Sequence, residues 1–237
     1  MSNFSAFANR LPDPAYKITE AGDNHSSGTA GPGFASVRFT SEQPSSISRT
    51  NSGRVISRAI VGHRWKINIS YNPMTREEFE PVYSFLLEKR GRLKPFFISL
   101  PQYNSPRTST SGTISVDGEI TAGASNFKVD GFGSITGGLR PGDMFNFNSS
   151  NSNHKKAYQI TRVLTNSDYL TGGTQPATDE RIYYVTPPIE KTVEDNATID
   201  YGSDTLIRVV QTADIQEYNL GTNNLYQFNL SLEEAQP

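Results

Sequence analysis

Three histidines are the first residues whose chemistry could serve catalysis or bind a metal ion. His25 lies in a segment rich in glycine and serine, His63 precedes an alternating apolar run, and His154 lies in a polar loop. None has a second histidine at metal-ligand spacing, and the chain contains no cysteine. Scattered histidines are usually structural or solvated, because a metal ion needs several ligands. We therefore expect no metal site and no cofactor, although a site built from distant residues stays open.

Two groups of glycines invite comparison with phosphate-binding loops. They are Gly131 with Gly133, and Gly137 with Gly138. No Gly-Lys-Ser/Thr follows them and no helix is expected to begin there, so we interpret them as turn glycines. A Gly-x-Ser-x-Gly motif is also absent from the sequence, which leaves a serine hydrolase without its nucleophile.

Charged residues cluster at the two ends of one predicted helix. Glu77 and Glu78 are adjacent carboxylates at its start, where capping and the helix dipole explain them without acid–base catalysis. The densest basic run, 89–94, is either the end of that helix with its loop or an anchor for an acidic partner. It has no interleaved aromatic residues and the net charge is −2, so we expect no nucleic acid or membrane as partner. We predict no catalytic residues and no enzyme activity.

The elements that position these residues form a frame shared by the two ends of the chain. Residues 64–71 are apolar at every second position, and so is the closing segment 225–232. Such alternation predicts strands with one buried face and one wet face. A sheet that joined them would tie the two ends together.

A helix is predicted over residues 75–90. Thr75 and Glu78 have the spacing of a capping box, and Gly91 is the expected left-handed stop. The apolar residues at helical spacing are Phe79, Val82, Tyr83, Leu86 and Leu87. Pro81 lacks the N–H that an interior position needs, so we expect a separate first turn over 75–80 and a regular helix from Pro81.

The middle of the chain differs from the frame in its sequence pattern. Short strands are expected there between Gly- and Pro-containing turns, at 113–117, 126–130, 143–148, 157–164 and 181–186. This pattern is typical of a small barrel or sandwich. Extended segments are also expected in the frame, at 34–40, 54–61, 95–100, 197–201 and 205–211.

The fold class predicted is α+β, mainly β. We expect an antiparallel β-sandwich or split-barrel frame with one packed helix, formed by residues 34–107 and 190–237. Residues 108–189 would form an inserted small all-β, barrel-like domain. Residues 1–33 are rich in Gly, Pro, Ser and Asn, and we interpret them as a flexible N-terminal arm. This arm is either a frayed tail or a segment that orders against a neighbouring subunit.

Length and composition bound the class of protein. The 237 residues suffice for one large domain or two small ones. The absence of cysteine excludes a disulfide framework. The first residues show no signal-peptide pattern, and no apolar run is long enough to span a bilayer. We expect a soluble protein that stays where it is made or leaves only inside a larger assembly.

The helix and its surroundings resemble a segment of tail proteins of tailed bacteriophages. The resemblance rests on residues 70–91, with the run Met-Thr-Arg-Glu-Glu-Phe at 74–79 and the basic-Gly stop at 90–91. It extends to Leu-Arg-Pro-Gly-Asp at 139–143, to 156–161, and to the ending at 225–234. The chain is most similar to proteins of the distal-tail or baseplate-hub type.

This resemblance implies a virion protein with a structural role and without an active site. It implies a β-rich belt domain that forms a homo-oligomeric ring, a hexamer, continuing the tail tube, and a further β domain that faces outward. The implied partners are other copies of the chain and tube, baseplate or fibre proteins, with assembly in the host cytoplasm. Proline is tolerated in the corresponding helix.

Two other functions stay open at this stage. The first is a carbohydrate-binding β module of a virion that recognises a host receptor, in which Tyr169, Tyr183 and Tyr184 would stack on sugars. Strand tyrosines are more often packing residues, which weighs against it. The second is an enzyme of unrecognised type, for which the sequence offers no motif.

Overall fold

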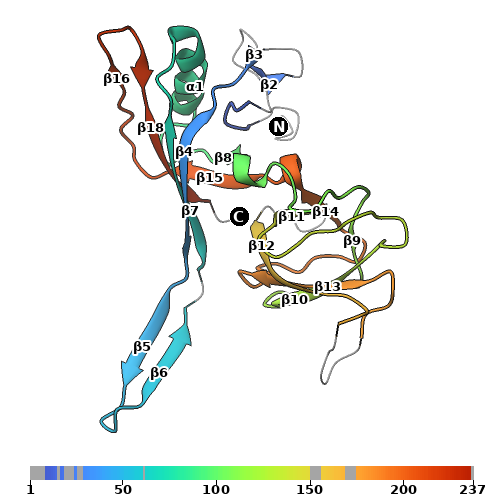
Figure 1. Cartoon of the computed structure of the whole chain (residues 1–237). Helices are drawn as coiled ribbons and strands as arrows, with labels where there is room; N and C mark the ends of the chain where they lie inside the picture. Colours follow the sequence, from blue (N-terminus) through green and yellow to red (C-terminus); the bar gives the residue numbers. More distant parts are fainter. Residues whose placement is uncertain are drawn as a thin grey trace. The chain divides into compact units, whose positions relative to one another are not determined.

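The computed structural model of the chain describes residues 9–14, 17–18, 24–25, 29–60, 62–149, 156–168 and 175–235. The chain folds into two compact units, one formed by residues 1–97 with 209–236 and the other by residues 98–208 (Figure 1). Both are built mainly from antiparallel strands, and the described residues include one α-helix. The predicted fold class, α+β and mainly β, is confirmed.

The two ends of the chain share one sheet in the first unit. Its strand order is β4 (Phe34–Glu42), β7 (Arg64–Tyr71), β18 (Asn229–Glu234), β15 (Ile207–Gln211) and β8 (Phe96–Ile98). β7 and β18 are antiparallel neighbours, with Ile67 opposite Leu232. The alternation predicted for both strands is confirmed, because their apolar residues are buried on one face while polar residues alternate with them.

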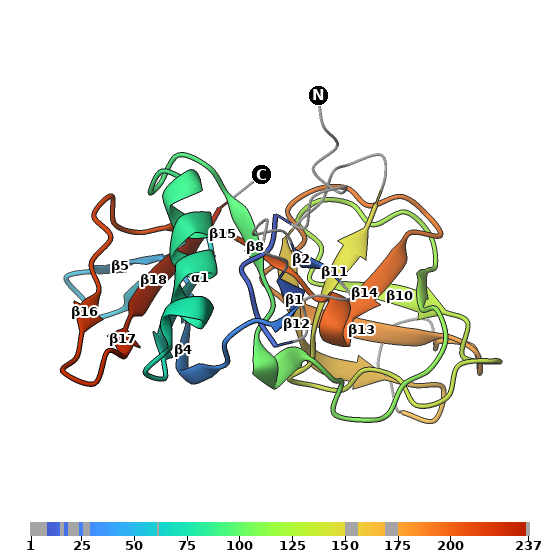
Figure 2. The same cartoon turned by 90° about the horizontal axis from the view of Figure 1, so that it is seen from above.

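Helix α1 (Arg76–Glu88) covers the apolar face of this sheet (Figure 2). Its buried residues are Phe79, Val82, Phe85 and Leu86. Phe85 packs edge-on against Phe96 of β8, and buried Gln211 donates a 3.0 Å hydrogen bond to the Leu86 carbonyl. The predicted stripe was right for three positions, but Leu87 is 50% exposed and Tyr83 is only half-buried.

Pro81 lies inside a continuous helix, and the expected break at this residue was wrong. The helix runs from Arg76 to Glu88 although Pro81 cannot donate a hydrogen bond to the Glu77 carbonyl. The burial of Phe79 and Val82 on either side of Pro81 fixes both parts of the helix on the same sheet. Tertiary packing therefore outweighs the local preference.

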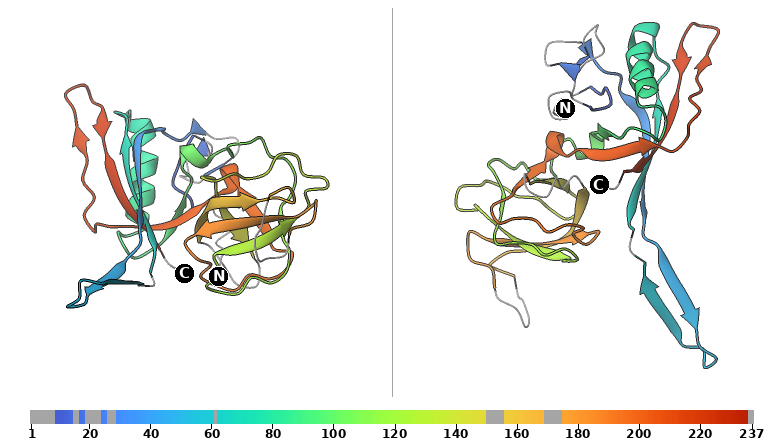
Figure 3. Two further views of the ribbon diagram at one scale, coloured as in Figure 1. Left: turned by 60° about the horizontal axis from the view of Figure 1, so that its bottom comes forward. Right: turned by 180° about the vertical axis from the view of Figure 1, so that it is seen from behind.

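A two-stranded hairpin leads out of the sheet between β4 and β7. It consists of β5 (Ser45–Arg49) and β6 (Val55–Ala59), paired so that Ile47 faces Ser57. The hairpin projects away from the rest of its unit in both views of Figure 3. The strand predicted at 54–61 corresponds to β6. β5 lies in the 41–53 stretch for which no strand was expected.

Part of the N-terminal segment is buried, in contrast to the flexible arm expected over 1–33. Leu11 is fully buried, and Arg10 is held by a 2.8 Å ion pair to Asp13. The Phe97 N–H donates to the Asn9 carbonyl and the Leu11 N–H donates to the Phe97 carbonyl, so residues 9–11 pair with β8. A small sheet follows, formed by β1 (Lys17–Ile18), β2 (Asn24–His25) and β3 (Thr29–Ala30).

The second unit is a closed six-stranded barrel. Its strand order is β10 (Asn126–Asp130), β13 (Arg181–Thr186), β12 (Ala157–Leu164), β11 (Met144–Asn148), β14 (Thr198–Tyr201) and β9 (Ser115–Val116). The inward-facing side chains include Phe127, Phe145, Phe147, Tyr158 and Tyr183, which make mutual ring contacts. Two 3₁₀ turns, η1 (Pro101–Tyr103) and η2 (Gly202–Asp204), also belong to this unit.

The barrel extends beyond the 108–189 range expected for the inserted domain. β14 lies between β11 and β9, so residues 198–201 complete the barrel, whereas the sequence pattern predicts that they belong to the frame. The second unit accordingly spans residues 98–208. The pairing partner of a short strand such as β14 cannot be read from its own pattern.

Candidate functional site

None of the histidines that first suggested chemistry forms a site in the part of the chain that the structure describes. His63 is buried, lies edge-on to Trp65 with ring centres 4.4 Å apart, and its Nε2 shares a 2.9 Å hydrogen bond with Ser41. It therefore packs the end of the β4–β7 pair. His25 belongs to β2, and His154 lies outside the described residues. No described group of three His, Asp or Glu side chains is arranged to hold a metal ion.

The adjacent glutamates cap α1, as predicted. The Thr75 N–H and hydroxyl both donate to the Glu78 carboxylate, each at 2.9 Å. Glu77 is exposed in the same first turn, where the helix dipole favours an anion. Glu78 therefore has the geometry of a helix cap.

The glycine pairs are turns in the barrel, as the sequence indicated. Gly131, Gly137 and Gly138 all have positive φ angles, which favour glycine. A side chain at Gly137 would meet the Ser109 carbonyl oxygen at 2.1 Å. No helix begins at these residues. They close turns against neighbouring backbone and offer no phosphate site.

Some residues of the basic run 89–94 pack against the protein, and others are exposed to solvent. Lys89 is 7% exposed, and its ammonium group lies 4.4 Å from the centre of the Phe85 ring. Arg92 donates to the Thr212 carbonyl. Arg90 and Lys94 are exposed. The run is the end of a helix and its loop, and only part of it is available to an acidic partner.

Two of the three tyrosines proposed to stack on sugars, Tyr183 and Tyr184, are described by the structure and are engaged in other contacts. Tyr183 is fully buried in the barrel core, and this burial raises the pKa of its phenol to about 12. The Arg162 guanidinium lies 3.7 Å from the centre of the Tyr184 ring and so covers it. Tyr169 lies outside the described residues. Tyr183 is thus used for packing and Tyr184 for a cation–π contact.

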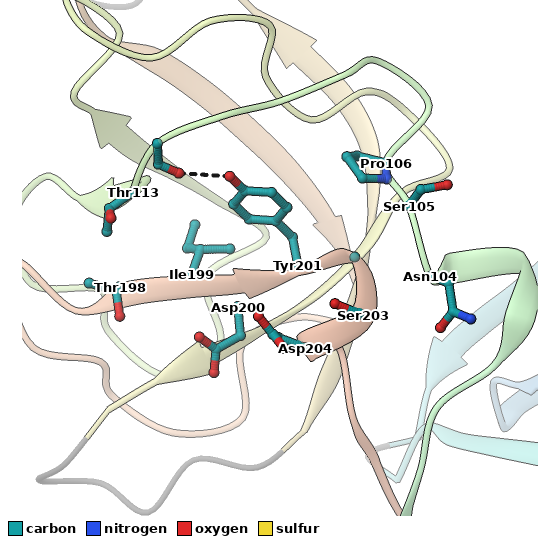
Figure 4. Close-up of a pocket in the computed structure, with 12 residues that line it drawn as sticks. Asn104, Ser105, Pro106, Thr113, Thr198, Ile199, Asp200, Tyr201, Ser203 and Asp204 are labelled. Atoms are coloured by element: carbon teal, nitrogen blue, oxygen red, sulfur yellow. Dashed lines mark hydrogen bonds between the residues drawn. The ribbon is translucent and has the colours of Figure 1, made fainter. Parts of the chain in front are cut away.

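One open pocket of about 610 Å³ lies on the barrel surface (Figure 4). β14, η2 and the loops 104–106 and 112–113 line it. The Tyr201 hydroxyl donates a 2.7 Å hydrogen bond to the Gly112 carbonyl, and its pKa is raised by partial burial and by the Asp204 charge. Asp200 and Asp204 add carboxylates. The pocket lining contains no histidine and no cationic residue.

Acidic side chains also gather at one end of the barrel strand β10. Partial burial raises the pKa of Asp130, and the nearby charge of Asp117 adds to the effect. Lys128 forms a 2.9 Å ion pair with Glu180 and a 3.5 Å pair with Asp117. These contacts hold β9, β10 and the start of β13 together, which is a structural role.

A surface of aromatic residues forms beside α1 in the first unit. Phe79 stacks on Tyr226 of β17 (Tyr226–Gln227), with ring centres 4.5 Å apart. Tyr218 contacts the rings of Phe79 and Tyr83 at 5.0 and 5.3 Å. β16 (Asn219–Leu220) pairs with β17 and places Leu220, 53% exposed, next to these rings. Phe79 is buried, and we call Tyr83, Tyr218 and Tyr226, whose rings pack on it, the aromatic face.

The β5–β6 hairpin exposes aliphatic side chains. These are Ile47, Val55, Ile56 and Ile60, each more than half exposed. Residues 44–60 also contain three arginines and no carboxylate, namely Arg49, Arg54 and Arg58. Sequence reasoning missed this surface, although the unbroken positive charge of the segment was visible.

The two edges of the frame sheet differ in their pairing. Residues 9–11 cover the β8 edge. β4, at the other edge, pairs with β7 and with no further described strand. β4 is nine residues long, so it presents an extended row of backbone groups to a partner.

Comparison with known proteins identifies the family of the chain. Residues 21–103 match the family model described as distal tail protein pb9, A domain, N-terminal. The chain is also 32% identical to distal tail protein pb9 of Escherichia phage T5 over 159 residues, which cover 67% of this chain and 71% of that protein. The chain belongs to the distal tail protein pb9 family. It is therefore a structural protein of a phage tail.

Membership of the pb9 family fits the boundary of the frame. The matched region ends at Tyr103, the last residue of η1, before the first barrel strand begins at Ser115. The match thus covers most of the first segment of the frame. Among the described helices, none is long and apolar enough to cross a membrane. The family resemblance drawn from the sequence is confirmed.

Proposed function

We propose that this pb9-family protein forms a homo-oligomeric ring, a hexamer, at the distal end of a phage tail. The ring would join the tail tube to baseplate or fibre proteins and would assemble in the host cytoplasm. This role is architectural and requires no catalytic centre.

The observation that carries the proposal is the asymmetry of the frame sheet. One edge, β8, is already covered by the chain's own residues 9–11, whereas the nine residues of β4 form an edge that no further described strand pairs with. A ring of identical subunits needs contacts between two different surfaces of neighbouring copies. A long open edge supports such a contact, because it can accept a strand or loop of the next copy.

We do not assign the ring contact to the buried part of the N-terminal segment. Leu11 and Asp13 are buried within their own unit, so this stretch is already committed. We place the contact on β4 instead. The barrel, which has a closed sheet and its own core, would stay free to face other tail components.

Sedimentation velocity of the purified full-length chain, followed by native mass spectrometry, tests the ring. We expect concentration-dependent formation of one closed species of six copies. A chain that stays monomeric at every concentration, and also in electron micrographs of concentrated samples, would contradict the proposal.

Proline substitutions in β4 test the role of its edge. Successive residues of a strand direct their N–H groups to opposite edges, so Val37→Pro and Arg38→Pro affect different sides. One variant should lower stability by breaking the pairing with β7, and the other should leave stability nearly unchanged. We expect the second variant to lose ring formation while it keeps a normal thermal unfolding transition.

A further inference from the structure

The β5–β6 hairpin is left uncovered by the described part of its own chain. All residues of β5 are exposed, and Val55 and Ile56 of β6 are each more than half exposed. Isolated two-stranded hairpins are marginally stable in water. Exposed aliphatic side chains on such a ribbon indicate a surface that is buried against a partner.

The charge of the hairpin indicates the chemistry of that partner. Arg49, Arg54 and Arg58 are its only charged residues within 44–60, in a protein whose net charge is −2. A partner surface with carboxylates and exposed apolar or aromatic groups would complement it. Arginine and tyrosine contacts of this kind carry much of the energy of many interfaces.

The aromatic face has these complementary properties. Tyr218 is 46% exposed, Leu87 follows Tyr83 by one helical turn, and Leu220 lies on β16. The helix α1 and the segment 212–227 contain six carboxylates and one arginine, and this arginine forms a 2.6 Å ion pair with Glu80; the basic run 89–94 follows the helix and reaches the segment through Arg92. The carboxylates are those of Glu77, Glu78, Glu80, Glu88, Asp214 and Glu217, and the arginine is Arg76.

The hairpin and the aromatic face cannot meet within one copy. β6 leads into β7 near Arg64, whereas the aromatic face lies at the Tyr71 end, where Met74 bridges to Tyr226. The eight residues of β7 separate the two surfaces by roughly 26 Å of extended strand. Figure 1 shows the hairpin and α1 at opposite ends of this strand.

We propose that the hairpin of one copy docks on the aromatic face of a second copy. The arginines would lie against the tyrosine rings and the carboxylates of α1, and the aliphatic side chains would cover Tyr218 and Leu220. The contact is heterologous, as a ring requires, and therefore rests on the ring-forming function proposed above. Because β4 continues directly into β5, a neighbour at the open edge would also be within reach of the hairpin.

Two variants of the full chain, each with substitutions at surface positions, test the contact in a mixing experiment. The hairpin variant carries Arg49→Ser, Arg54→Ser and Arg58→Ser, and the face variant carries Glu217→Ala and Tyr218→Ala. We expect each alone to self-associate at least about tenfold more weakly than the unsubstituted chain. An equimolar mixture should regain association as dimers, because one intact hairpin and one intact face remain. Far-UV circular dichroism checks that both variants are folded.

Cross-linking gives a second measurement that does not depend on affinity. The chain has no cysteine, so Ser48→Cys in the hairpin and Asn219→Cys beside Tyr218 introduce a single pair. We expect oxidation to yield disulfide-linked oligomers. A matched chain with Ser48→Cys and Ala122→Cys, the latter on an exposed barrel loop, should stay unlinked.

The outcomes separate this docking contact from the ring itself. If both variants form rings as the unsubstituted chain does, the hairpin serves another partner, so the docking proposal fails and the ring stands. If only the hairpin variant loses association, hairpins pair with each other and the proposal also fails. If the unsubstituted chain stays monomeric and the cysteine pair does not cross-link, both the ring and the docking contact are rejected.

Discussion

At the scale of single residues, the polar groups of this protein hold structure together. Buried Gln211 donates to the last turn of α1, and Glu78 caps the first turn. Asp143 accepts hydrogen bonds from the backbone N–H groups of Arg107 and Arg140 and so fixes the turn before β11. Each of these groups could have been a candidate for chemistry by residue type. Their partners are backbone atoms, which is typical of structural contacts.

Asn146 is a polar side chain in the barrel whose structural role can be tested by substitution. Its amide donates to the Lys156 carbonyl at 3.0 Å and accepts from the Leu206 N–H at 2.8 Å. We expect Asn146→Ala to destabilise the barrel by about 1–3 kcal/mol, because the buried Lys156 carbonyl and the partly buried Leu206 N–H each lose a hydrogen bond.

Circular dichroism in urea measures this effect in the full chain. The single tryptophan, Trp65, lies in the other unit, so its fluorescence serves as an internal reference that should change much less. Asn126→Ala, at an exposed strand position, is the matched control. Equal stability of the two variants would refute the structural role of Asn146.

Tyr183 makes the stability of the barrel sensitive to alkali. Its pKa is raised to about 12 by burial, above the usual value of 10.0, so folding favours the neutral phenol. This contribution is complete below about pH 10 and is lost as the pH rises toward about 12. We expect Tyr183→Phe, which has no phenol to ionise, to keep more of its neutral-pH stability at pH values near 11.

Thermal unfolding at pH 8 and near pH 11 measures the alkaline loss. Tyr184→Phe, half-buried on the same strand, provides the comparison. The prediction fails if the barrel with Tyr183→Phe loses as much stability between the two pH values as the unsubstituted barrel does.

At the scale of elements, the strongly periodic segments could be predicted from the sequence. β7, α1 and β18 alternate or repeat clearly because each buries one face, and their positions were expected within a few residues. β5 could not be predicted in this way. Its sequence Ser-Ser-Ile-Ser-Arg has no buried face, so no alternation marks it.

The burial of part of the N-terminal segment also could not be predicted from the sequence pattern. Arg10 and Asp13 are polar, yet both are buried because they pair with each other and because residues 9–11 extend the sheet. A composition rich in glycine and proline indicates weak local structure. It contains no information about an edge strand elsewhere that can take up the segment. The exposed site surfaces were missed for the same reason, since exposure depends on neighbours.

Pro81 provides a prediction at the level of the helix. Since α1 is continuous through this residue, one hydrogen bond to the Glu77 carbonyl is missing. Pro81→Ala should restore it and stabilise the first unit by about 1–3 kcal/mol. Trp65 fluorescence in urea reports the change, because Trp65 is buried in the sheet of the same unit. Ser84→Ala, exposed in the same helix, should contribute about 0.5 kcal/mol or less. A destabilised Pro81→Ala variant would show that the proline is needed for the path of the helix.

At the scale of the whole molecule, the barrel is placed in the chain as an insertion. The chain leaves the first unit after Phe97 and returns to it at Val209. These two points lie on β8 and β15, which are neighbours in the sheet. An insertion between neighbouring strands leaves the hydrogen-bonded frame continuous, so the barrel can be exchanged or lost without a new topology.

Removal of the barrel tests this organisation directly. Joining Ile98 to Ile207 by a short Gly-Ser linker should give a folded frame, because β8, β15 and their neighbours keep their pairing and core. We expect the shortened chain to unfold cooperatively, with the Trp65 fluorescence transition within about 1–2 kcal/mol of its value in the full chain. Residues 98–208 expressed alone should also unfold cooperatively, since they contain a closed barrel and its core. A frame that needs the barrel to fold would show no cooperative transition after excision. In that case the two units would form one thermodynamic domain, and the barrel could not vary independently of the ring that we propose for the frame.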